Sequence, residues 1–244
     1  MHNDRLDMNN VTGDQELPLL EHVRELRQRM LIVVAALIIV LMGTFPFTGD
    51  LIGTMWAYLF PPEIEMVIYS PMEWMLTRLV LSLAIAIAFV FPLFMYEFFA
   101  FVQKGLFPNE KRFTLFVFPP SMFLFLTGMG VAFFIVIPLI FNYMFHYSED
   151  VATSGISVRD TFSLITTLMI MFGLLFQLPI LMVISIKSGL VKADQLKDKR
   201  VVVYGILIGF AIFIAPDITG MSQLITAFFL VLLFEFSLLI SRYV

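Results

Sequence analysis

The residues best suited to chemistry in this sequence are charged, and they stand in residues 19–30, just before the first long apolar segment. Glu25 and Arg29 are four residues apart in the favourable order on a helix and support each other by about 0.2–0.5 kcal/mol. Glu21 stands four residues before Glu25 and repels it by a similar amount. The local pairing is therefore close to neutral, and we expect Glu25 to be available to an outside cation.

The simplest interpretation of this run is an amphipathic helix beside the membrane. Its apolar side chains recur at helical spacing and share one face, at Leu19, Val23, Leu26 and Met30. Pro18 suits the first position of such a helix, because its missing N–H would have no partner there. On this interpretation, the arginines of the run only hold the N-terminal segment in the cytoplasm.

Three further polar residues fall within apolar segments, where polar groups are functional candidates by default: Gln177, Glu97 and Glu235. Glu97 and Glu235 stand near the ends of their segments that we assign to the cytoplasm, so either can reach water. Gln177 stands about midway along its segment and cannot easily do so. We expect Gln177 to face a concave interior or a partner helix, where a polar contact contributes about 0.6–2 kcal/mol.

Composition narrows the class of protein. The 244 residues are 60% hydrophobic and 14% charged, whereas soluble domains are about 45–50% apolar and about 25% charged. We therefore expect an integral membrane protein. Cysteine is absent, which excludes disulfides, thiolate metal sites and a cysteine nucleophile. The histidines are scattered and no P-loop glycine motif is present, so we expect no metal, cofactor, nucleic-acid partner or ATP-driven transport.

The apolar segments predict an all-α integral membrane protein with six transmembrane helices, at residues 30–47, 75–100, 113–141, 161–186, 201–215 and 221–241. They form a single membrane domain over residues 18–244, preceded by a mobile cytoplasmic tail at residues 1–17. The prolines at 119, 120 and 138 are expected to bend or break the third helix near both ends. The fifth helix, and with it the sixth, is expected to be short: 15 residues reach only about 22 Å of the roughly 30 Å hydrocarbon core. We expect the fifth helix to contact a partner helix for that reason.

The distribution of basic residues predicts the sidedness. Placing both termini and the second and fourth loops on one side puts all but two of the 15 Lys and Arg residues there, the exceptions being Arg78 and Arg159. This is a positive-inside pattern with both termini in the cytoplasm. Residues 48–74 carry four acidic residues, no Lys or Arg and several aromatic residues, so we expect a structured external cap there.

The same residues resemble a known family. Residues 22–30, His-Val-Arg-Glu-Leu-Arg-Gln-Arg-Met, resemble the His-Leu-x-Glu-Leu-Arg-x-Arg-Leu signature of TatC, the multi-spanning receptor subunit of the twin-arginine protein translocase. Further features of that family recur in order along residues 18–242: Ser70-Pro71, Phe101, residues 109–112 and 128–134, Phe176-Gln177-Leu178-Pro179, Ala215-Pro216-Asp217, Ser222-Gln223 and Phe234-Glu235. Gln177 stands where many bacterial members carry a glutamate.

The resemblance implies a receptor and scaffold in a multi-copy complex of the cell membrane, embedded in the lipid bilayer. Such a protein binds the twin-arginine signal peptides of folded precursor proteins, recruits small single-span Tat subunits of the TatA/TatB type, and is not an enzyme. It implies that Glu25 and Glu110 converge on the arginine pair, with Arg27 and Phe101 nearby. Asp217 would lie in the external turn of the last hairpin. Carboxylates suit this task because they accept two-pronged hydrogen bonds from arginine, which lysine cannot donate.

Two other classes of function remain as alternatives. A small-solute secondary transporter commonly shows internal repeats and a polar site near the midplane. This sequence shows no convincing repeat, and its apolar segments are sparse in charge. An intramembrane enzyme would need a Ser/His pair, an Asp/Asp pair or a metal-binding cluster at one depth, and none of these is found.

Overall fold

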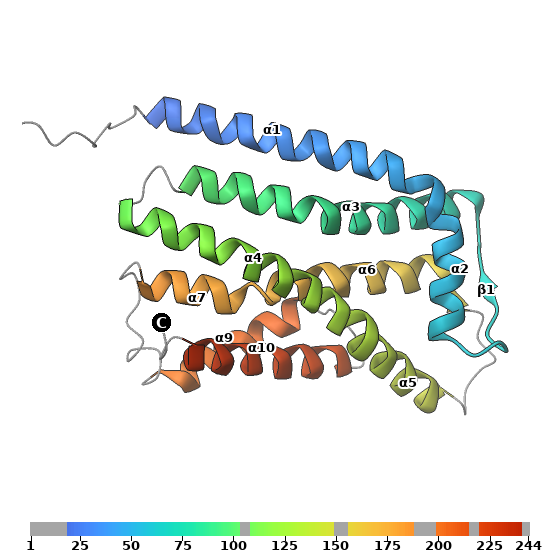
Figure 1. Cartoon of the computed structure of the whole chain (residues 1–244). Coiled ribbons are helices and arrows are strands. Elements are labelled where there is room, and N and C mark those ends of the chain that lie inside the picture. Colours follow the sequence, from blue (N-terminus) through green and yellow to red (C-terminus); the bar gives the residue numbers. More distant parts are fainter. Residues whose placement is uncertain (1–18, 103–107, 149–155, 188–198, 215–219, 241–244) are drawn as a thin grey trace, which may run out of the picture.

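The computed structural model describes residues 19–102, 108–148, 156–187, 199–214 and 220–240. Nearly all of these residues are helical, and the long helices lie side by side (Figure 1). Five helical runs are long and apolar enough to cross a membrane: Val23–Leu59, Pro71–Phe101, Phe118–Met144, Val158–Ile186 and Ser222–Leu239. The predicted all-helical membrane fold is confirmed.

Helix α1 spans Leu19–Thr44 and joins the amphipathic run and the first apolar segment in one helix. A 3₁₀ turn, Phe45–Phe47, then leads into α2, Thr48–Leu59. The axis of α2 turns sharply from that of α1 (Figure 1). Arg78 holds this turn by donating hydrogen bonds to the carbonyls of Phe45 at 3.0 Å and Pro46 at 3.2 Å. Its guanidinium also lies over the ring of Phe45. The arginine therefore ties α3, which carries it, to the carbonyls of this turn.

The second apolar segment forms α3, Pro71–Val102. Its first turn is a capping box: Ser70 Oγ accepts a hydrogen bond from the N–H of Glu73, and the Glu73 carboxylate accepts one from the N–H of Tyr69. Glu73 also accepts a hydrogen bond from the hydroxyl of Ser157. That contact ties the start of α3 to a small parallel pairing of β1, Met66–Val67, with β2, Ile156–Ser157.

The expected cap at residues 48–74 is structured, because α2 packs its buried face into the core. Trp56 is buried, and its indole N–H donates to the carbonyl of Ile64 at 3.1 Å. A polar tip on an otherwise apolar ring is satisfied in this way without reaching water.

The third segment comprises α4, Pro108–Val131, a π-helical stretch at Ala132–Val136, and α5, Ile137–Ser148. The prolines were expected to bend or break this helix near both ends; it does not break at them, and its regular winding changes at the π-helical stretch just before Pro138. Pro119 and Pro120 lie inside α4, and Pro138 follows the π-helical stretch without ending the helix. Wider local turns and neighbouring groups can satisfy the carbonyls that proline leaves without partners in a membrane helix.

The fourth segment is interrupted, unlike the prediction of one helix. Helix α6 spans Val158–Leu175, and α7 spans Leu178–Lys187 after a turn at Phe176 and Gln177. Pro179 supplies the cause, because it has no N–H to donate and its ring clashes with the carbonyl four residues earlier.

The last two helices differ in length. Helix α9, Arg200–Ile214, has 15 residues and reaches about 22 Å, so the expectation of a short fifth helix is confirmed. Helix α10, Met221–Ile240, has 20 residues and reaches about 30 Å. The expectation that the sixth helix is also short was therefore wrong, because its regular apolar helix is long enough to cross a membrane.

A close approach of α4 and α6 lies in the centre of the bundle. A Cβ atom added at Gly128 would stand 2.5 Å from the carbonyl oxygen of Phe172, and one added at Gly173 would stand 2.8 Å from the ring of Phe125. Glycine at both positions lets the two helices pack this closely. Phe125 and Phe172 are fully buried, and Phe125 stacks on Phe91 with ring centroids 3.6 Å apart.

Candidate functional site

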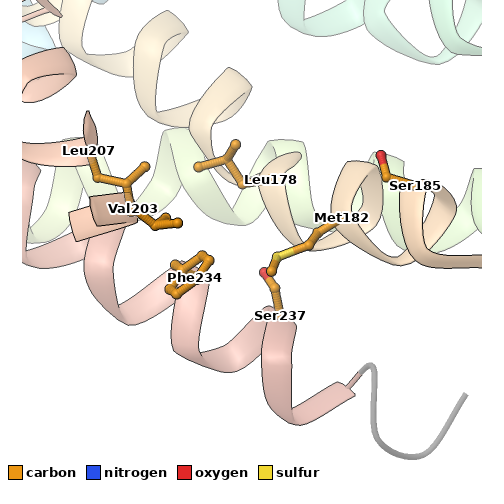
Figure 2. Close-up of a pocket in the computed structure, with 7 residues that line it drawn as sticks. All are labelled: Leu178, Met182, Ser185, Val203, Leu207, Phe234 and Ser237. Atoms are coloured by element: carbon orange, nitrogen blue, oxygen red, sulfur yellow. The ribbon is translucent and has the colours of Figure 1, made fainter. Parts of the chain in front are cut away.

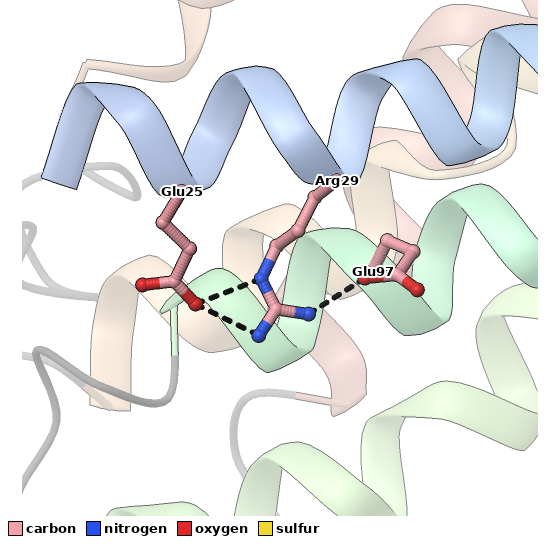
Figure 3. A network of polar contacts seen from close by, with 3 residues as sticks. All are labelled: Glu25, Arg29 and Glu97. Carbon is pink, nitrogen blue, oxygen red and sulfur yellow. Dashed lines mark hydrogen bonds and ion pairs between the residues drawn. The ribbon is translucent and has the colours of Figure 1, made fainter. Parts of the chain in front are cut away.

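Three charged side chains from two helices form one network at the start of α1 (Figure 3). Arg29 donates from Nε and Nη2 to Oε1 of Glu25, at 2.9 and 2.8 Å. Its remaining terminal nitrogen, Nη1, donates to Oε2 of Glu97 at 2.6 Å. The side chains of Arg29, Glu25 and Glu97 are 21%, 17% and 10% exposed. One guanidinium is thus held between two carboxylates that are mostly removed from solvent.

The local sequence explains this arrangement only in part. Glu25 and Arg29 share a face of α1 because they are four residues apart. That face lies against α3, and Glu97 stands near the end of α3, where it meets the arginine from the other side. The expectation that Glu25 would be available to an outside cation is therefore corrected. A third charge on a distant segment holds Arg29 in place, and the periodicity of α1 cannot reveal it.

The network carries a net charge of −1 when all three groups are ionised. Buried carboxylates and guanidinium groups persist when they are paired and hydrogen-bonded to one another. The arrangement recognises a guanidinium through its planar, multiply donating geometry. The structure thus shows carboxylates of two helices binding a guanidinium within the protein.

The other residues predicted for this site stand on elements that share one end of the molecule. The beginning of α1, the end of α3 and the beginning of α4 lie at that end, as does the end of α7 (Figure 1). Arg27 is exposed on α1, and Phe101 is partly exposed at the end of α3. Glu110 belongs to the first turn of α4, but its side chain lies outside what the structure describes. Asp217 also lies outside the described residues.

Gln177 is buried, with 4% of its surface exposed, and it lies in the break between α6 and α7. Its side-chain oxygen accepts a hydrogen bond from the hydroxyl of Ser121 at 2.7 Å. Its side-chain nitrogen donates to the carbonyls of Ser121 and Gly173. The amide thus binds a carbonyl at the helix break and links α6 to α4. Of the two predicted placements, a concave interior or a partner helix, the structure shows Gln177 in the protein interior.

Glu235 on α10 lies between two residues of α9. It accepts a hydrogen bond from the hydroxyl of Tyr204 and pairs with Arg200 at 3.4 Å. Its side chain is 34% exposed. These contacts join α9 to α10 near the beginning of α9, and sequence periodicity did not indicate them.

An apolar cleft of ≈ 230 Å³ lies close to this pair, between α7, α9 and α10 (Figure 2). Its lining includes Leu178 and Met182 from α7, Leu207 from α9 and Phe234 from α10. Such a lining offers packing surface rather than reactive groups.

The outer face of α9 is apolar and largely uncovered by the described residues. Val202, Ile206 and Phe210 are all more than half exposed. Gly205 and Gly209, four residues apart, also lie on the exposed side, and a Cβ atom added at either would meet no described atom within 4 Å. No group of three His, Cys, Asp or Glu side chains able to hold a metal ion occurs among the described residues.

Comparisons of the sequence and of the structure with known proteins find the same family. The family model described as Sec-independent protein translocase protein (TatC) matches residues 21–228. The Sec-independent protein translocase protein TatC of Methanocella arvoryzae is 42% identical over 231 residues, which cover 95% of this chain and 96% of that protein. The TatC of Aquifex aeolicus is 32% identical and is covered to 95%, with 93% of this chain matched.

A solved structure shares the fold. The crystal structure of the twin-arginine translocase receptor TatC in the detergent DDM superposes with a TM-score of 0.80 at 29% identity. The match covers 90% of this chain and 99% of that one.

Proposed function

The chain belongs to the TatC family of Sec-independent protein translocase proteins, and we propose from this premise that it binds twin-arginine signal peptides through Glu25 and Glu110. As a TatC protein it is a membrane subunit of the twin-arginine translocase. The observation that carries the proposal is the guanidinium held by Glu25 and Glu97 at the end where α1, α3 and α4 meet. A site built to hold one arginine in this way has the chemistry to hold another.

The recognition step follows from the shape of the charges. Glu25 accepts two N–H groups from a planar guanidinium, and Glu110 supplies a second carboxylate for the other arginine of the pair. A lysine ammonium is a compact point charge that cannot reproduce the planar fork, so a Lys-Lys signal binds less well. Phe101 and Arg27 border the site and contact the rest of the signal peptide.

Partner recruitment is assigned to α9. Its 15 residues are too short for an average bilayer, so lipid alone matches it poorly. The exposed glycines at 205 and 209 allow another helix to approach its backbone closely, and Val202 and Ile206 supply packing surface beside them. A small single-span Tat subunit fits this face. The positive-inside pattern supports a cytoplasmic location of both termini, and membership of the translocase family supports a location in the cell membrane.

A secondary transporter is a weaker account of the same geometry. The polar residue in the middle of a span, Gln177, already uses its oxygen and its nitrogen within the protein. A solute would have to displace these buried hydrogen bonds to use the amide.

Binding of a synthetic signal peptide to the purified protein tests the proposal. Glu25→Ala and Glu110→Ala should each weaken binding by at least about thirtyfold, since removing one partner of a desolvated charge pair costs about 2–5 kcal/mol. Glu63→Ala is the matched control, because Glu63 is exposed in the segment between α2 and β1 at the opposite end of the molecule. Binding that is as tight in both single variants as in the wild type would refute the site.

A further inference from the structure

The guanidinium of Arg29 occupies the carboxylate that the proposed function gives to a signal arginine. Two of its N–H groups point to the same oxygen of Glu25, at 2.8 and 2.9 Å. Arg29 is fixed to α1 four residues from Glu25, so it reaches this oxygen without any loss of translational freedom. A signal arginine that binds this oxygen of Glu25 must therefore compete with an arginine of the protein itself.

Glu97 offers Arg29 a second partner. Nη1 of Arg29 donates to Oε2 of Glu97 at 2.6 Å, and this carboxylate is the least exposed of the three groups. It is carried by α3, on the opposite side of the guanidinium from Glu25 (Figure 3). Arg29 can thus release Glu25 by a change of its own side-chain angles and keep one charged partner throughout. Without Glu97, the same release would leave a mostly buried guanidinium without a carboxylate, which is costly.

We propose that Arg29 is an internal competitor for signal arginines, and that Glu97 is the carboxylate that retains Arg29 when a signal arginine takes Glu25. This inference rests on the proposed signal-peptide function. Glu97 is then a positioning residue, since it acts on the peptide through Arg29 and need not touch the peptide.

The competition has a quantitative consequence. A site that is available for only a fraction of the time binds every ligand more weakly by that fraction. Arg29 therefore lowers the affinity for Arg-Arg and Lys-Lys peptides by the same factor. A Lys-Lys peptide has the lower affinity to begin with, so the same reduction makes its binding negligible while the Arg-Arg peptide still binds. Competition from Arg29 thus raises the intrinsic affinity that a peptide needs in order to bind, but it does not change the ratio of the Arg-Arg and Lys-Lys affinities.

A double-mutant cycle in the full-length protein, in detergent micelles, tests the exchange. The probes are a synthetic peptide with an Arg-Arg pair and the same peptide with Lys-Lys. Arg29→Lys keeps the charge but loses the planar fork, so it should bind the Arg-Arg peptide more tightly than the wild type. Arg29→Gln should tighten it by about tenfold, and should tighten the Lys-Lys peptide by the same factor. Arg24→Gln removes the same charge from an exposed position of α1 and should change either affinity by less than about twofold.

Glu97→Gln should weaken binding of the Arg-Arg peptide by about tenfold when Arg29 is present. In the Arg29→Gln background the same substitution should weaken it by less than about twofold. An equal effect in both backgrounds would show that Glu97 binds the peptide directly, and would overturn the inference. Weaker binding in both Arg29→Lys and Arg29→Gln would also overturn it, because Arg29 would then only orient Glu25. Thermal unfolding of each variant identifies any loss of fold, and Arg29→Lys, which keeps all three charges, carries the test if Arg29→Gln unfolds. A wild-type protein that binds neither peptide would instead refute the proposed function.

Discussion

Gly128 and Gly130 provide a matched pair of substitutions in one helix, because only Gly128 touches a neighbouring helix. A Cβ atom at Gly128 would stand 2.5 Å from the carbonyl oxygen of Phe172 and 2.9 Å from Cγ of Phe176. A Cβ atom at Gly130 would meet no described atom within 4 Å. Ordinary contact begins at 3.4 Å, so Gly128→Ala must move α4 and α6 apart by about 1 Å in a close-packed interior.

The cost of this movement sets the expected difference in stability. Overpacking a well-packed core costs about 1–3 kcal/mol, and contact with backbone rather than a flexible side chain puts Gly128→Ala near the upper end. Alanine changes the helix propensity of α4 by the same amount at both positions, so that contribution cancels in the comparison. We expect Gly128→Ala to be less stable than Gly130→Ala by about 3 kcal/mol.

Unfolding of the two purified variants in the same detergent, followed by circular dichroism, measures this difference. Gly130→Ala should unfold at or slightly above the wild-type midpoint, and Gly128→Ala clearly below it. Equal midpoints for the two variants would refute the close approach of α4 and α6 that the structure shows.

Three further predictions concern separate parts of the molecule. Gln177→Leu should destabilise the protein by about 1–2 kcal/mol in the same unfolding assay, because buried carbonyls lose the side-chain amide that binds them; an unchanged midpoint would contradict that role. Ser70→Ala should cost about 1 kcal/mol by removing the cap of α3, and hydrogen exchange should quicken in the first turn of α3 if the capping box forms in solution. Val202→Cys should form cross-links to a cysteine-bearing single-span subunit, whereas Leu207→Cys, which faces the cleft, should not. Cross-linking is clean in a chain without native cysteine, and equal yields at the two positions would argue against docking on the outer face of α9.

Much of the fold follows from local patterns in the sequence. The long apolar segments predicted the spanning helices, and the proline-bounded fifth segment predicted the short α9. Gln177 was expected to face either a concave interior or a partner helix because it could not easily reach water, and it is buried within the protein. These features depend on residues that are close together in the chain and on their hydropathy, and both can be read from the sequence.

The features that the sequence did not predict depend on contacts between distant segments. Glu97 meets Arg29 across 68 positions of sequence, and no periodicity in either helix indicates that pairing. Pro179 accounts for the break before it, but the partner of Gln177 at that break, Ser121, belongs to the distant helix α4. Pro119 and Pro120 look like helix breakers by local rules, yet α4 continues through both. Whether a helix continues through a proline therefore depends on its packing against the other helices of the bundle.

The most direct measurement of receptor function is photo-cross-linking from the signal peptide. A precursor with a photoreactive residue beside its Arg-Arg pair would be irradiated with the purified protein, and the adducts mapped by mass spectrometry. Our account predicts adducts in the first turns of α1 around Glu25 and at the end of α3 around Phe101, with a large loss of yield for a Lys-Lys precursor. Adducts confined to the opposite end of the molecule, around α2 and β1, or equal yields from the two precursors, would contradict it.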